Sequence, residues 1–115
     1  MVMRQLDQAF AALADPTRRG IVVLLARGEA TVTDLVGQFD LTQPTISSHL
    51  KVLESAGLIS RGRIAQSRPR RLEPDRLKAV TDWLEQVQEI WEGNYKRLDA
   101  LLTELKQDAQ PERKK

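Results

Sequence analysis

The side chains best suited to chemistry in this 115-residue sequence are hydrogen-bonding groups between residues 43 and 51. A glutamine can pair through two hydrogen bonds with the edge of an adenine base, and serine or threonine can bond to several base edges. Small side chains also let a helix backbone come close to the floor of a DNA groove. The residues whose types fit this chemistry are Gln43, Thr45, Ser47 and Ser48.

A helix over residues 43–56 would present these groups to solvent. Ile46, Leu50 and Leu53 lie at positions i, i+4 and i+7, so they are expected to form its buried face. At 100° per residue, Lys51 falls on the far side together with Ser48. The alternative is that these groups are ordinary solvated residues of a surface helix.

A short helix and a tight turn precede this segment. Thr31 or Thr33 can cap the short helix, which would bury Leu35. Asp40 and Leu41 follow as the turn, and Thr42 is the expected cap of the second helix. Residues 31–57 therefore predict a helix-turn-helix, in which the second helix enters the major groove.

Positive charge is concentrated beside this motif. The net charge is only +2, but residues 41–72 contain six basic groups against Glu54 alone. Residues 58–73 predict a β-hairpin, called the wing, in which Pro69 suits only an edge strand. Arginine binds phosphate through two parallel hydrogen bonds, although a basic loop can also serve solubility alone. The candidate phosphate contacts are Lys51, Arg61, Arg63, Arg68 and Arg70.

The first two helices are expected over residues 4–14 and from Asp15 to Gly28. Arg18 and Arg19 lie at the start of the second helix, where a cation opposes the helix dipole. Another partner is therefore expected for them, either DNA phosphate or an acidic residue of a second copy.

Residues 74–105 predict a long helix whose apolar residues recur in two heptad rows. A stripe of this length exceeds what one small domain can cover, so we expect it to pair with a second chain. The aromatic residues could also line a cavity for an apolar small-molecule effector. Gly93 and Asn94 are a weak point at which the helix could kink or split. The candidate interface residues are Leu6, Phe10, Leu84, Val87, Trp91 and Leu98.

His49 is the single histidine and lies beside the buried face of its helix. One interpretation is a half-buried packing or hydrogen-bonding residue. The other is a DNA contact or a pH-sensitive group. The sequence leaves both interpretations open.

The combination of DPTRR, the TVTDL helix, TQPTISSHLKVLESAGLI and the following RGR resembles the ArsR/SmtB family of bacterial winged-helix repressors. The resemblance covers about residues 9–63. It implies a homodimer that binds an inverted-repeat operator near its own promoter and is usually released by an effector. It places the family's base contacts on Gln43, Thr45, Ser47 and Ser48, and its wing arginines on Arg61, Arg63 and Arg68.

Two departures concern regulation. The segment Thr31–Asp34 has no Cys-x-Cys pair, and the last helix has carboxylates but no histidine. Zinc and similar ions favour Cys or His ligands, so neither of the family's familiar metal sites is expected. The chain has no cysteine at all, and its few scattered glycines do not form a phosphate loop, so an enzyme is not expected.

The predicted fold is mainly α with a small β-hairpin, a winged helix-turn-helix with a long C-terminal dimerisation helix. Residues 1–105 are expected to form one domain, with the helix-turn-helix at 31–57, the wing at 58–73 and the C-terminal helix at 74–105; residues 106–115 would be a flexible tail. The predicted function is a homodimeric DNA-binding repressor without a cofactor; an unknown apolar small molecule or a protein partner could be its effector, or it could have no small-molecule effector. The alternative is a winged-helix module that binds protein. No apolar run approaches a membrane span and no signal peptide is evident, so a cytoplasmic protein is expected, associated with the nucleoid when bound to DNA.

Overall fold

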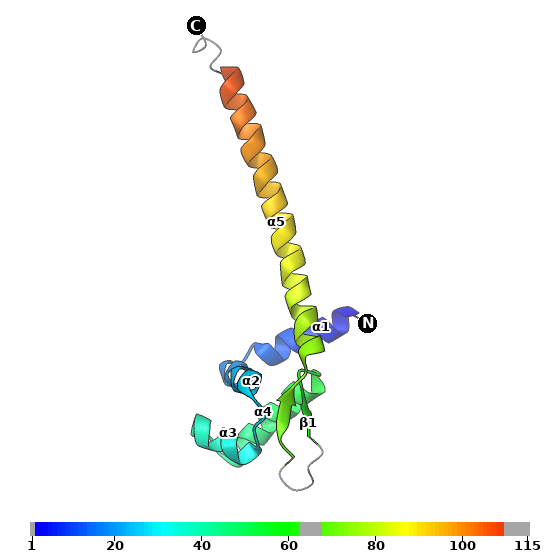
Figure 1. The fold of residues 1–115 in the computed structure, drawn as a ribbon, viewed down its shortest axis with the longest axis vertical. Coiled ribbons are helices and arrows are strands. Elements are labelled where there is room, and N and C mark those ends of the chain that lie inside the picture. Colours follow the sequence, from blue (N-terminus) through cyan, green and yellow to red (C-terminus); the bar gives the residue numbers. More distant parts are fainter. Residues whose placement is uncertain (1, 63–67, 110–115) are drawn as a thin grey trace. The chain divides into compact units, whose positions relative to one another are not determined.

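The computed structural model describes residues 2–62 and 68–109, and within these ranges it contains five helices and one two-stranded sheet (Figure 1). The elements are α1 (Val2–Leu13), α2 (Pro16–Arg27), α3 (Val32–Phe39), α4 (Gln43–Ser55), β1 (Ile59–Arg61), β2 (Arg70–Leu72) and α5 (Pro74–Ala109). By its internal contacts the chain divides into two parts, Met1–Val80 and Thr81–Lys115. The predicted winged helix-turn-helix with a long C-terminal helix is confirmed.

Side-chain caps fix where the first helices begin. The Asp15 carboxylate accepts a hydrogen bond from the backbone N–H of Arg18, at the start of α2. Thr31, and not Thr33, caps α3, and Asp34 completes a capping box by accepting from the N–H of Thr31. Thr42 caps α4 as predicted, because its hydroxyl accepts from the N–H of Thr45. These bonds satisfy donors that would otherwise lack partners at each helix start.

We expect Thr42→Ala to lower the free energy of unfolding by about 1 kcal/mol, because alanine cannot accept the hydrogen bond at the start of α4. Chemical denaturation measures the change directly. Thr33→Ala is a matched control, since the observed cap of α3 is Thr31. An equal loss in both variants would contradict the capping role of Thr42.

The core of the first part is aliphatic and lies between the helices. Its largest fully buried side chains are Ile21, Leu35, Ile46, Leu50, Leu53 and Leu58. The three predicted anchors of α4 are among them. Leu6 also belongs to this core and is only 7% exposed, so its own chain covers most of it, and its place in a dimer interface stays a prediction. The helical pattern showed that Leu6 would be covered, but it could not show whether its own chain or a second chain covers it.

The wing is a short antiparallel hairpin in which Ile59 faces Leu72 and Arg61 faces Arg70. On its other side, Arg70 exchanges two backbone hydrogen bonds with Ala30, 2.8 and 3.1 Å long. Pro69 lies just before β2, where its missing N–H costs no bond of the ladder. The start of β2 is therefore joined to both β1 and the segment before α3.

Helix α5 continues through Gly93 and Asn94 and ends at Ala109. Residues 106–109 were predicted to belong to the flexible tail, but they are helical, because no glycine or proline interrupts the chain there. The rest of that predicted tail, 110–115, lies outside the described residues. Every described side chain from 81 to 108 is exposed in the single chain.

Candidate nucleic-acid interface

The exposed side of α4 carries the predicted base-contacting residues together. Gln43, Thr45, Ser47 and Ser48 are all exposed, while Ile46, Leu50 and Leu53 are buried. The Thr45 hydroxyl lies 2.8 Å from that of Thr42, so it belongs to the capped first turn. Lys51 is exposed one turn further along. The first turns of α4 thus expose several hydrogen-bonding groups, as base recognition in a groove requires.

The predicted wing arginines have three different environments. The side chain of Arg61 is 46% exposed, although its Nε donates to Glu54 at 3.0 Å. Arg68 is exposed and has a positive φ of 33°. Both guanidinium groups can reach solvent and hence phosphate. The prediction for Arg63 lies outside the described residues.

Arg70 differs from these, because burial and internal partners occupy the guanidinium for which a phosphate contact is predicted. It is only 8% exposed, its Nε donates to the Glu54 carboxylate at 2.9 Å, and its Nη1 donates to the carbonyl of Arg68 at 2.7 Å. A buried guanidinium requires such partners because burial removes its water. Sequence reasoning also missed Glu54, although it is the lone acidic residue among 41–72.

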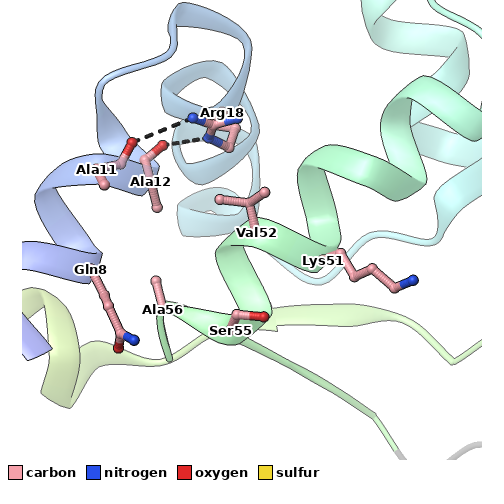
Figure 2. A pocket seen from close by; sticks show the side chains of 8 residues that line it. All are labelled: Gln8, Ala11, Ala12, Arg18, Lys51, Val52, Ser55 and Ala56. Atoms are coloured by element: carbon pink, nitrogen blue, oxygen red, sulfur yellow. Dashed lines mark hydrogen bonds between the residues drawn. The ribbon is translucent and has the colours of Figure 1, made fainter.

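Arg18 ties the end of α1 to α4. Its guanidinium donates to the carbonyls of Ala11 and Ala12, as Figure 2 shows, and its Nη1 lies 3.3 Å from His49 Nδ1. Arg19 donates to the carbonyl of Leu13. Neither of the expected partners, phosphate or an acidic group of a second copy, is therefore needed. The two arginines donate to carbonyls in the last turn of α1, where the helix dipole favours a cation.

His49 is half-buried, with 18% of its side chain exposed, and it contacts Arg18 and Asp15. These contacts favour the packing and hydrogen-bonding interpretation. They also connect α4 to the start of α2 through side chains that are distant in sequence.

The pKa of Asp15 lies below its ordinary value of 3.8, first because the Arg18 N–H donates to its carboxylate and further because electrostatic attraction to His49 and Arg18 favours the ionised carboxylate. A carboxylate whose pKa is lower in the folded protein than in the unfolded chain stabilises the fold at pH values above its unfolded pKa. This stability is lost as the pH falls through the folded pKa. We therefore expect the melting temperature to fall more steeply for the wild type than for Asp15→Asn between about pH 5 and pH 3. Asparagine keeps the cap but does not titrate. Parallel melting curves in this range would contradict the role of Asp15.

An open hollow of about 430 Å³ lies between α1, the first turn of α2 and α4 (Figure 2). Its lining is mostly apolar and consists of Gln8, Ala11, Ala12, Arg18, Lys51, Val52, Ser55 and Ala56. This is not the place expected for an effector along the aromatic residues of α5. The effector there stays a prediction.

The predicted interface residues of α5 form an exposed apolar stripe. Leu84, Val87, Trp91 and Leu98 are all more than two-fifths exposed in the single chain, and Trp91 reaches 68%. Phe10 of α1 is also partly exposed. Continuous apolar surface of this kind marks an interaction site.

Within residues 2–62 and 68–109, no group of three or more His, Asp or Glu side chains is arranged to hold a metal ion. Nor is any helix in that part of the chain both long and apolar enough to span a bilayer.

Comparison with known proteins agrees with this geometry. Residues 15–61 match the model of the bacterial regulatory protein, arsR family. The HTH-type transcriptional regulator Rv2034 of Mycobacterium tuberculosis is 40% identical over 77 residues, which are 67% of this chain and 72% of that protein. The arsenical resistance operon repressor of Escherichia coli is 35% identical over 100 residues, 85% of this chain and 82% of that protein.

Solved structures give the same result. A crystal structure of an ArsR family transcriptional regulator superposes with a TM-score of 0.70 at 40% identity, covering 77% of this chain and 92% of that chain. The solution structure of a homodimeric winged helix-turn-helix domain from Mycobacterium bovis has a TM-score of 0.61 at 26% identity, covering 83% and 85%. The chain therefore belongs to the ArsR family of bacterial regulatory proteins.

Proposed function

We propose that this protein is a homodimeric transcriptional repressor that binds an inverted-repeat operator through α4, the recognition helix, and through the arginines of the wing. The observation that carries the proposal is the set of exposed hydrogen-bonding side chains on the first turns of α4, a helix anchored by three buried aliphatic residues. Relatives from Escherichia coli and Bacillus subtilis are named as repressors, which supports the direction of regulation.

The proposed dimer rests on α5. Its apolar stripe is exposed in the single chain, and burying it against a second copy would remove a large apolar area from water. A two-fold axis would then place the two recognition helices about 34 Å apart, so that each meets one half of a palindromic site. The related Mycobacterium bovis domain is a homodimer, in agreement with this arrangement.

Two other functions are less well supported. A winged-helix module that binds only protein would not need the exposed base-contacting set on α4, and the named relatives are transcriptional regulators. The same relatives argue against an enzyme. We place the repressor in the cytoplasm, on the chromosome when it is bound to DNA. No effector is assigned to it.

A binding titration tests the proposal. Labelled DNA from upstream of the protein's own gene and a scrambled DNA of the same composition would be titrated at several salt concentrations. We expect a specific complex that is at least about a thousandfold tighter than the scrambled one, with affinity falling steeply as salt rises. If a folded dimer binds both DNAs equally, or neither at low salt, the proposed function is wrong.

A further inference from the structure

A single acidic side chain, Glu54, joins the recognition helix to both strands of the wing. Glu54 lies in the last turn of α4, and its carboxylate accepts from Arg70 Nε of β2 at 2.9 Å. The same carboxylate accepts from Arg61 of β1, through Nε at 3.0 Å and Nη2 at 3.4 Å. No other salt bridge among the described residues joins α4 to the wing.

The Arg70 side of this connection is rigid. Arg70 is the only buried charged residue in the part of the chain that the structure describes. Its backbone is held by Ala30 on one side and pairs with Arg61 on the other. A buried cation that loses its counter-ion keeps the cost of desolvation and loses the attraction that offsets it. Glu54 therefore holds Arg70 in one position, and through it the base of the wing.

The ion pair between Arg61 and Glu54 can be replaced by a contact between Arg61 and a phosphate. Nearly half of the Arg61 side chain is exposed, whereas only 20% of the Glu54 side chain is. An exposed ion pair is weak and is readily replaced by a phosphate that offers the same two-point geometry. While DNA is absent or wrongly placed, Glu54 competes with phosphate for Arg61.

We propose that Glu54 is a positioning residue for operator binding: it fixes the wing relative to the recognition helix, and it restrains Arg61 from nonspecific phosphate contact. The inference rests on the proposed function. Its consequence is that Glu54 strengthens binding to the operator and weakens binding to other DNA. Neither a purely structural residue nor a simple negative charge would have opposite effects on the two affinities.

The test compares Glu54→Gln with Glu73→Gln, each measured on operator and on scrambled DNA. Both variants remove one negative charge beside the wing. The Glu73 carboxylate accepts a hydrogen bond from the Ser60 hydroxyl and lies 3.8 Å from Arg71 Nε. Both of these partners belong to the wing, so these contacts do not join the wing to α4. For Glu54→Gln we expect operator binding to weaken about tenfold relative to Glu73→Gln. Binding to scrambled DNA should tighten, with a salt slope steeper by about one phosphate contact.

Circular dichroism would first establish that Glu54→Gln is folded. If it is not, the double variant Glu54→Gln/Arg70→Gln serves instead, because it removes both members of the buried pair and leaves the net charge unchanged. It should also lose about tenfold in operator binding. Equal ratios of operator to scrambled affinity in the Glu54 and Glu73 variants would overturn the inference alone. A wild type without operator preference would overturn the proposed function first.

Discussion

We expect Trp91→Glu to dissociate the homodimer into monomers of 13.0 kDa and to weaken operator binding by at least about a hundredfold. Trp91 is the most exposed large apolar residue of the stripe on α5. A carboxylate at that position in a dimer interface would lose its water without gaining a partner. The operator affinity falls as well, because each monomer then meets only one half-site and the second contact is no longer intramolecular.

Sedimentation velocity measures the mass, and the binding titration measures the affinity. Ala100→Glu is the matched control, because it adds the same charge on the same helix about 180° away from Trp91. Ala100 is exposed, and its variant should remain dimeric. An intact dimer for Trp91→Glu would remove this residue from the interface.

Substitutions on α4 and on the wing should weaken binding in different ways. Gln43→Ala or Ser48→Ala should make the free energy of operator binding less favourable by about 1–3 kcal/mol, because a contact to a base edge is lost. The preference for particular bases at that position should be relaxed as well. The combined change of Arg61 and Arg68 to alanine should weaken binding to every sequence. It should also reduce the salt slope by about two units, since two phosphate contacts are lost.

Ser55→Ala controls for the loss of a hydroxyl on the same helix. Ser55 lies in the last turn of α4 and lines the hollow beside α1, away from the first turns. It should leave affinity and salt slope near the wild-type values. If the α4 and wing variants show equal losses on all DNAs and unchanged slopes, the division between base recognition and phosphate contact is wrong.

Local features of the sequence are sufficient to predict helix α4, its buried face and its N-terminal cap. The spacing of Ile46, Leu50 and Leu53 defines its buried face, and Thr42 is a strong cap by residue type alone. The hairpin followed from short apolar runs around a polar, proline-containing turn. These features depend on neighbours within a few residues, so no knowledge of tertiary packing was needed.

The features that sequence reasoning missed depend on partners distant in sequence. Arg70 was grouped with the exposed arginines because charge along the chain does not show that Glu54, 16 residues earlier, lies beside it. An external partner is expected for Arg18 from sequence because its actual partners are not visible there. They are carbonyls of the preceding helix and His49, which is 31 residues away. Leu6 was assigned to the interface for the same reason, since an apolar stripe does not reveal which surface covers it.

The placement of two recognition helices on one operator is the central claim, and hydroxyl-radical footprinting of the wild-type protein on its upstream DNA tests it most directly. The account predicts two protected segments related by two-fold symmetry, centred about 10 base pairs apart, which are lost together in Trp91→Glu. A single protected segment, or uniform protection without a preferred site, would contradict it.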